Sequence, residues 1–233
     1  MALTTNLVSY WKFDSSNSND SVTTNNGTDT SITYGTGIIG NGSVYNGTTS
    51  KITLPSVAWG IATNYSLQSW IKTTIITNTN AQIFCNDSPT LSKRIWQFGL
   101  AAGTTSQSIR FIRFDSTNTL VTNISGTTQV NDGLWHHVIC TFDSAVGSKV
   151  YIDGTSNASD AVTTANGNAA AVALFGGIDS GSTSAFWNGT LDEIAIWNRT
   201  LSSTEVTSLY NSGAGLQYPF ATAISKLALL GVG

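Results

Sequence analysis

Apolar and polar residues alternate along many short stretches of the chain, with the period of two that half-buried strands show. From Tyr65 to Lys72, for example, Tyr, Leu, Ser and Ile alternate with Ser, Gln, Trp and Lys. Asn-Gly and Asp-Gly turn signals recur between such stretches. The pattern predicts about a dozen antiparallel strands in two packed sheets. We expect strands at residues 7–13, 42–45, 51–54, 65–72, 82–85, 95–100, 109–114, 135–142, 149–152, 171–175 and 189–197.

One helix is well marked in the last part of the chain. Ser202 stands three residues before Glu205, which is the spacing of a capping box. Val206 and Leu209 then fall on one face of a helix, and Gly213 ends the pattern. The sequence therefore predicts a short capped helix after the last strand.

Composition supports a β protein and excludes some partners. Only 10% of the 233 residues are charged, so long charged helices are not expected. Seven tryptophans and a hydrophobic fraction of 40% can form a core, which a disordered chain lacks. Ten basic residues stand against 13 acidic ones, and we therefore expect no nucleic-acid ligand. Cys85 and Cys140 lie in apolar runs and are expected to be buried free thiols.

The two ends of the chain differ in character from the middle. The first residues contain neither the basic region nor the apolar run of a secretory signal. The apolar stretch 220–232 is too short for a membrane span and is interrupted by Lys226, so membrane insertion is not expected. We expect a domain at 1–215 and an apolar tail at 216–233. The tail could add an element to the domain, dock on another subunit as an oligomerisation segment, or fray.

Three segments in order carry a family resemblance. They are LVSYWKFD with NDSVTTNNGT and GSVYNGTTSKITLP (7–55), WHHVICTFD with KVYIDG (135–154), and NGTLDEIAIWNRTLSSTEVTSLY (188–210). Together they resemble the laminin-G-like, concanavalin A-like jelly-roll family over residues 7 to 213. The resemblance implies an all-β fold, a two-sheet antiparallel jelly-roll sandwich with one short capped C-terminal helix. Proteins of this fold include lectins, adhesion modules, enzymes and particle-surface proteins.

The residues do not provide the pair of carboxylates that glycoside hydrolysis requires. The chain has two glutamates, Glu193 and Glu205, and Glu205 is assigned to the helix cap. Asp192 is expected to point to the opposite face from Glu193, so that pairing them would need a bulge. His136 and His137 are adjacent on a predicted strand and are expected to have structural roles. We therefore predict no catalytic residues and no enzyme activity.

The family resemblance also implies a structural calcium ion. The candidate ligands are Asp20 and Asn26 in the loop NDSVTTNNG, with Asp192 of the last strand as a third. The alternative is that Asp20 and Asn26 fasten the loop through side-chain to backbone hydrogen bonds.

Sugar recognition needs an aromatic surface beside polar groups. Trp59 and Trp187 lie in loop-like, glycine-containing stretches and are the candidate sugar platforms. Local packing is the alternative for both rings.

These features favour a non-enzymatic surface, decoration or adhesion subunit of a virus- or phage-like particle, with host glycans as candidate ligands. Other subunits would dock through the tail, and the protein would be found at the surface of a virion or an extracellular particle. The alternative is a stand-alone, calcium-stabilised carbohydrate-binding lectin. A glycoside hydrolase is the remote alternative.

Overall fold

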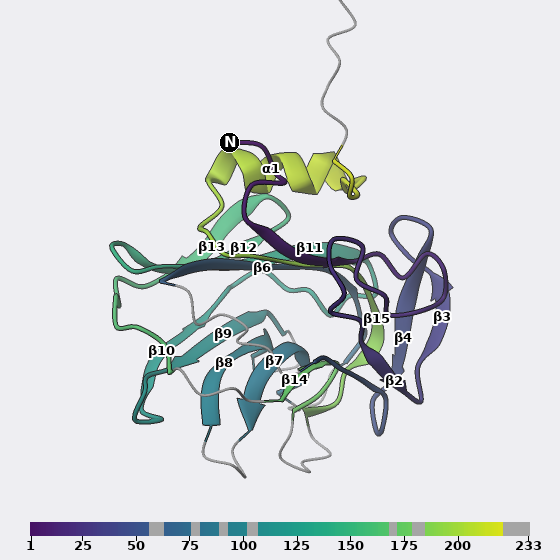
Figure 1. Cartoon of the computed structure of the whole chain (residues 1–233), viewed down its shortest axis with the longest axis horizontal. Coiled ribbons are helices and arrows are strands. Elements are labelled where there is room, and N and C mark those ends of the chain that lie inside the picture. Colours follow the sequence, from purple (N-terminus) through teal and green to yellow (C-terminus); the bar gives the residue numbers. More distant parts are fainter. Residues whose placement is uncertain are drawn as a thin grey trace, which may run out of the picture.

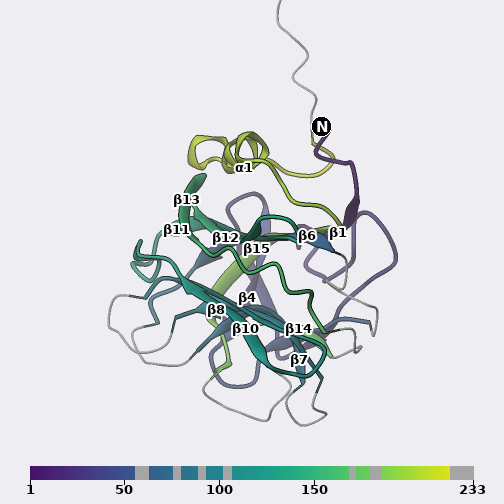
Figure 2. The same ribbon diagram turned by 90° about the vertical axis from the view of Figure 1, so that its left-hand side faces the viewer.

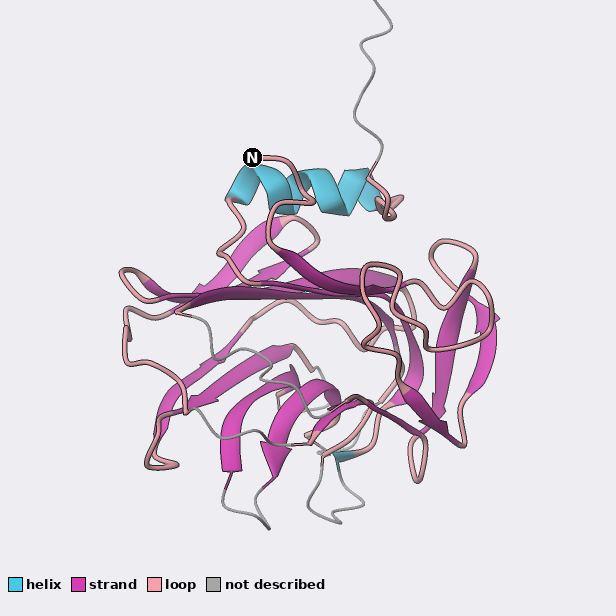
Figure 3. Ribbon diagram, viewed as in Figure 1, coloured by secondary structure: helices cyan, strands magenta, loops and turns pink. Residues whose placement is uncertain are grey.

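The computed structural model describes residues 1–55, 63–75, 80–88, 93–101, 107–167, 172–178 and 185–220. In these residues two antiparallel sheets stack face to face, and one α-helix lies on the outer side of one sheet (Figures 1 and 2). Strands make up most of the regular structure (Figure 3). The predicted jelly-roll sandwich with one short C-terminal helix is confirmed.

The two sheets have eight and seven strands. The eight-stranded sheet has the order β13 (Thr155–Ser159), β12 (Gly147–Ile152), β11 (Trp135–Asp143), β6 (Asn64–Lys72), β15 (Asn188–Trp197), β4 (Asn41–Asn46) and β3 (Thr33–Thr36), and β1 (Leu7–Trp11) also pairs with β15. The seven-stranded sheet has the order β10 (Leu120–Ser125), β9 (Ile109–Phe114), β8 (Lys93–Leu100), β7 (Gln82–Ser88), β14 (Ala173–Phe175), β5 (Lys51–Thr53) and β2 (Thr28–Thr30).

Four strands lie outside the stretches that the sequence pattern predicted, and all four are edge strands. They are β13 and β3 in one sheet and β10 and β2 in the other. Edge strands are short and solvated, so they do not need an apolar face. All three residues of β2, for instance, are exposed. The pattern of apolar positions therefore detects the inner strands and misses the edges.

The core between the sheets is built from aromatic rings. Trp11 and Phe84 both meet Phe175 edge-on, with ring centroids 4.9 and 4.6 Å apart. Phe84 also contacts Trp96 at 4.7 Å in the same geometry. Edge-to-face contacts of this kind suit the opposite charges of ring edge and ring face. Cys85 and Cys140 are both buried, as predicted, and they form no disulfide with each other.

A second apolar layer covers the outer face of the eight-stranded sheet. It joins Tyr10, Ala195 and Trp197 from the strands with Val206 and Leu209 from α1 (Ser203–Tyr210). Figure 1 shows α1 lying across this face, away from the other sheet. As a result β6 is buried over seven of its nine residues, not on one face as its alternation predicted.

Helix α1 begins where the sequence places it. The Ser202 side chain accepts from the Glu205 backbone N–H, and the Glu205 side chain accepts from the Ser202 N–H, which completes the predicted capping box. Glu205 also accepts two hydrogen bonds of 2.8 Å from the Arg199 guanidinium. Arg199 in turn donates to the carbonyl oxygens of Thr5 and Ala2. One buried ion pair thus joins the helix start to the N-terminal segment.

The first five residues of the expected tail pack on the sandwich. Tyr218 and Phe220 lie on the outer apolar layer, with centroids 5.7 and 5.6 Å from the Tyr10 ring. Residues 221–233 lie outside the described residues, and the predicted docking or oligomerisation segment falls mostly on them. No helix within the described ranges is long and apolar enough to cross a membrane.

A β-bulge in β15 puts the side chains of Asp192 and Glu193 on the same face of the sheet, which the sequence did not predict. The pairing of β15 with β6 shifts between Asp192 and Ala195, and Glu193 has a left-handed backbone with φ of 48°. The carboxyl of Glu193 accepts from the Tyr10 hydroxyl and, at 2.7 Å, from Gln217. The expectation that the two acids occupy opposite faces of a regular strand is wrong, because the bulge adds one residue.

Both carboxyl groups are fully buried. Asp192 accepts from the backbone N–H groups of Ile38 and Ile39 at 2.9 and 3.2 Å. Burial, reinforced by the neighbouring Glu193 charge, raises the pKa of Asp192 to about 8. Burial likewise raises the pKa of Glu193 to about 7. The fold therefore favours the protonated form of both groups.

We predict that Glu205→Gln lowers the free energy of unfolding by about 2 kcal/mol at pH 7, because it removes a charge-assisted hydrogen-bond pair but keeps a capping side chain. The pKa of Glu205 is lowered to about 2, with Arg199 and Ser202 stabilising the carboxylate against the cost of burial. That stabilisation is present above the ordinary glutamate pKa and is lost as the pH falls towards 2. Urea denaturation at pH 7, 5 and 3 should show the two proteins converging at low pH, and a constant difference would contradict the prediction.

We also predict that Glu193→Gln reduces the loss of stability at alkaline pH. A raised carboxyl pKa gives a contribution that is full below the ordinary glutamate pKa and is lost as the pH rises through about 7. The native protein should therefore lose about 2 to 3 kcal/mol more than the variant between pH 5 and pH 9. The control is Asp115→Asn, because Asp115 lies in an exposed turn and its pKa is lowered by hydrogen bonds from Thr117 and Thr119. Equal losses for native protein and E193Q would overturn this assignment.

Candidate functional site

The two tryptophans predicted as sugar platforms have different outcomes. Trp187 is 0% exposed and belongs to the core between the sheets, so its ring cannot stack on a ligand. Trp187 is therefore a packing residue, which was the alternative prediction for it. Trp59 falls in 56–62 and lies outside the described residues.

The predicted calcium ligands Asp20 and Asn26 lie together, but they are engaged in loop hydrogen bonds. The Asn26 side chain accepts from the Asp20 N–H at 2.9 Å. Asp20 accepts from the backbone N–H groups of Tyr10 and Val22 and from the Thr23 hydroxyl. Asp20 therefore fastens the loop, which is the role that the alternative to calcium predicted.

Asp192 does not complete that site. Its carboxyl is held by the backbone of Ile38 and Ile39 and by the Glu193 N–H, at the bulge of β15. In the part of the chain that the structure describes, no three Asp, Glu, His or Cys side chains are grouped to hold a metal ion. The hydrogen bonds of Asp20 and Asn26 thus match the predicted turn chemistry, and the calcium ion stays a prediction.

The adjacent histidines have separate structural surroundings. His136 lies between Asp153 and Asp132, at 2.8 and 3.1 Å, and the hydrogen bond to Asp153 contributes most to raising its pKa. His137 is fully buried, its pKa is lowered to about 3 by burial, and its ring centroid lies 5.0 Å from that of Trp70. Among the residues that the structure describes, neither ring forms a hydrogen bond with a serine or cysteine side chain.

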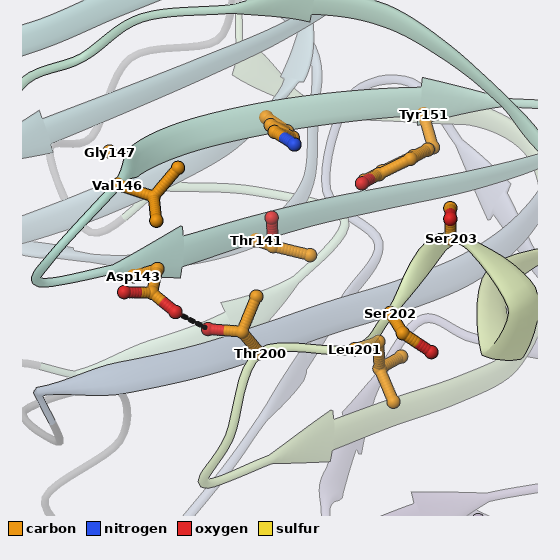
Figure 4. Close-up of a pocket in the computed structure, with 10 residues that line it drawn as sticks. Thr141, Asp143, Val146, Gly147, Tyr151, Thr200, Leu201, Ser202 and Ser203 are labelled. Atoms are coloured by element: carbon orange, nitrogen blue, oxygen red, sulfur yellow. Dashed lines mark hydrogen bonds between the residues drawn. The ribbon is translucent and has the colours of Figure 1, made fainter.

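A pocket of about 240 Å³ lies on the outer face of the eight-stranded sheet, beside the start of α1. We call it the helix-side pocket. Figure 4 shows that its walls come from the β11–β12 hairpin and from the segment that leads into α1. The lining residues are Thr141, Asp143, Val146, Gly147, Lys149, Tyr151, Thr200, Leu201, Ser202 and Ser203.

Local hydrogen bonds fix both walls of the helix-side pocket. The Asp143 side chain accepts from the Ala145 N–H at 2.9 Å, which shapes the hairpin turn. On the other wall, the Thr200 hydroxyl bonds the Asp143 carboxylate at 3.0 Å, the contact drawn in Figure 4. Ser66 of the central strand β6 accepts from the Leu201 N–H at 2.9 Å. The pocket is therefore held by the sheet and is not a gap beside a loose loop.

Several polar groups in the helix-side pocket are free to bind a ligand. Thr141 and Tyr151 are 2% and 5% exposed, and their hydroxyls make no hydrogen bond to any described residue. The Thr141 and Tyr151 hydroxyls lie on the pocket side of their strands (Figure 4). Val146 adds apolar surface at the rim and is 56% exposed. The pocket thus combines accessible, unpartnered hydroxyls with apolar contact surface.

The outer face of the seven-stranded sheet is a weaker candidate, because its polar side chains pair with one another. Arg94 forms an ion pair of 2.9 Å with Asp87. Arg110 donates to the side chains of Asn123 and Asn80 at 2.8 and 3.1 Å. A ligand would have to break these contacts before it could make its own.

Another hollow, of about 250 Å³, lies among residues 12–21. Its lining is mostly polar, and it includes Asp20, whose oxygens are already occupied by the loop. Charged Lys12 and Asp14 also line it. This hollow lacks the exposed apolar surface that the helix-side pocket has at Val146.

Sequence reasoning placed the strands of the helix-side pocket but not the pocket. The alternation along β11 and β12 puts Thr141 and Tyr151 on the face away from the core, and their orientation can be predicted from the sequence. The position of residues 200–203 over that face cannot be predicted from the sequence, because it depends on where α1 docks. Tryptophan content drew attention to Trp187, whose ring lies in the core.

Comparison with known proteins agrees with the architecture. The family model of the concanavalin A-like lectin/glucanases superfamily, Laminin_G_3, matches residues 46–207. Among curated proteins, adhesion G-protein coupled receptor D1 of Homo sapiens is 31% identical over 95 residues, which are 40% of this chain and 11% of the receptor. The chain therefore spans only a small part of that relative.

Solved structures share the fold at low identity. Domain 4 of AbnA, an extracellular GH43 arabinanase of Geobacillus stearothermophilus crystallised with arabinotriose, has a TM-score of 0.68 at 22% identity, covering 87% of this chain and 97% of that one. The binding domain of Paraclostridial Mosquitocidal Protein 1 has a TM-score of 0.74 at 16% identity, with 89% and 52% covered. The binding domain of botulinum neurotoxin serotype G has a TM-score of 0.63 at 18% identity, with 88% and 50% covered.

At such identities the structural likeness establishes the fold alone. The family model, in contrast, covers more than half of the chain, including the hairpin and helix start that form the helix-side pocket. The chain belongs to the concanavalin A-like lectin/glucanases superfamily.

Proposed function

We propose that this chain is a non-catalytic carbohydrate-binding domain and that the glycan binds in the helix-side pocket. The observation that carries the proposal is that the Thr141 and Tyr151 hydroxyls, on largely buried side chains, line an open pocket and have no partner among the described residues. Neither oxygen is among the buried polar atoms without a partner, so water reaches both, and a ligand hydroxyl can take the place of that water.

The chemistry of the pocket fits a sugar. A sugar ring has apolar C–H surface and a rim of hydroxyl groups, so it is bound by apolar side chains beside a few placed polar groups. Val146 and the Tyr151 ring provide apolar contact, and the hydroxyl groups of Thr141 and Ser203 can exchange hydrogen bonds with the rim. The Asp143 carboxylate is an additional acceptor.

Hydrolysis of the bound sugar is not part of this proposal. Retaining and inverting glycosidases both need two carboxyl groups flanking the scissile bond. The described lining of the helix-side pocket contains one carboxyl, Asp143. The acidic pair at the β15 bulge is fully buried and is engaged by Tyr10, Gln217 and backbone N–H groups. We therefore propose binding without turnover.

The relatives supply candidate ligands. The arabinanase domain of the same fold was crystallised with arabinotriose, and the toxin structures are of binding domains. These ligands belong to those proteins, but they make arabinan oligosaccharides a reasonable part of a ligand screen. A glycan array that also holds uronic acids, sialylated glycans and neutral glycans tests the wider class.

We predict that Thr141→Val and Tyr151→Phe each weaken glycan binding about 3- to 10-fold, because each removes one hydroxyl and keeps the shape of the side chain. The measurement is a glycan array with the native chain, followed by calorimetry on the best ligand. Thr36→Val is the matched control, because Thr36 is an exposed hydroxyl residue on β3, at the opposite end of the sheet from β12.

Two outcomes would overturn the proposed function. One is an array on which the folded native chain binds no glycan. The other is binding that T141V, Y151F and T36V leave equally unchanged, since the glycan would then occupy another surface. Turnover of a bound oligosaccharide would contradict the non-catalytic part only.

A further inference from the structure

Lys149 is a cation in the helix-side pocket without a counter-ion. It lies on β12 directly across from Thr141 of β11, and it lines the pocket with its neighbour Tyr151. In the described part of the chain Lys149 forms no ion pair or hydrogen bond. Lys149 is partly buried, and Thr141 and Tyr151 flank it on the same face of the sheet.

The one carboxylate that lines the same pocket is already engaged. The two oxygens of Asp143 accept from the Ala145 N–H and from the Thr200 hydroxyl, at 2.9 and 3.0 Å. Asp143 therefore keeps its place in the hairpin and does not pair with Lys149. The charge of Lys149 is left to interact with a molecule from outside.

The groups beside Lys149 are hydrogen-bond donors. The side chains of Thr141 and Tyr151 are largely buried, and burial raises the pKa of Tyr151, so its phenol stays protonated. A cation with two hydroxyl donors around it is suited to an oxyanion, and a carboxylate accepts such bonds more strongly than a neutral hydroxyl does. Asp143, on the hairpin end, would repel a carboxylate and so orients it towards Lys149.

We propose that the helix-side pocket selects sugars that carry a carboxylate, the uronic and sialic acid class, and that the sugar carboxylate binds the Lys149 ammonium group. The inference rests on the proposed function and names the ligand class of the same pocket. The Thr141 and Tyr151 hydroxyls donate to the carboxylate or to the neighbouring ring oxygen, and Asp143 accepts from a sugar hydroxyl on the other side.

The test uses the full chain and defined oligosaccharides. Trigalacturonate and sialyllactose are the acidic probes, and arabinotriose and lactose are the neutral ones. Binding is measured by calorimetry for native protein, Lys149→Gln, Lys149→Arg and the control Lys72→Gln. Lys72 is an exposed residue at the end of β6 in the same sheet, so K72Q removes one surface charge outside the pocket. The melting temperature of each variant checks that it is folded.

We expect the native protein to bind one of the acidic probes, and K149Q to weaken that binding about 10- to 100-fold, which is the size of a charge-assisted contact. K149R should retain most of the affinity and K72Q all of it. Raising the salt concentration should weaken acidic binding in the native protein more than in K149Q.

Each other outcome has a separate meaning. Binding of neutral probes without acidic ones overturns the ligand class and leaves the proposed function intact. Acidic binding that K149Q does not change overturns the role of Lys149. Equal loss in K149Q and K72Q indicates general charge attraction and also overturns it. Absence of binding to all probes and to the wider array overturns both proposals together.

Discussion

The outer parts of this protein depend on one constraint, the need to cover the aromatic outer face of the eight-stranded sheet. Tyr10, Trp70 and Trp197 are large, buried side chains that a two-layer sandwich would leave in water. Helix α1 and residues 216–220 bury them, and burial of such rings is worth several kcal/mol. The sheet is consequently a middle layer, with the aromatic core on one side and the helix on the other.

Much of the fold was predictable because its signals are local. Alternation identified the inner strands, and Ser202 with Glu205 identified the helix start. The edge strands were not identified, since exposed residues need no particular pattern. The bulge at Glu193 could not be predicted either. It depends on contacts with Tyr10 and Gln217, which lie near opposite ends of the chain and meet only in the folded protein.

The candidate site was less predictable than the fold. Residue type suggested Trp187 as a sugar platform, but the core uses that ring. Loop composition suggested Asp20 and Asn26 as ligands, and the hydrogen bonds of the loop use those groups. The helix-side pocket forms where the start of α1 docks on the β11–β12 hairpin. This long-range contact cannot be predicted from the types of the individual residues. The role on a particle surface, expected from the sequence, stays a prediction.

The placement of the helix-side pocket links occupancy to the dynamics of one element. One wall belongs to the sheet and the other to the start of α1, so the pocket exists only while the helix is docked. In native-state fluctuations, elements on the outside of a domain can open while the core stays closed. A molecule that binds only the docked state at a hundred times its dissociation constant adds about 2.7 kcal/mol against that opening. Amide hydrogen exchange in residues 203–210 would then slow when a ligand fills the pocket. The exchange rate of the α1 backbone would therefore indicate whether the domain has bound its ligand.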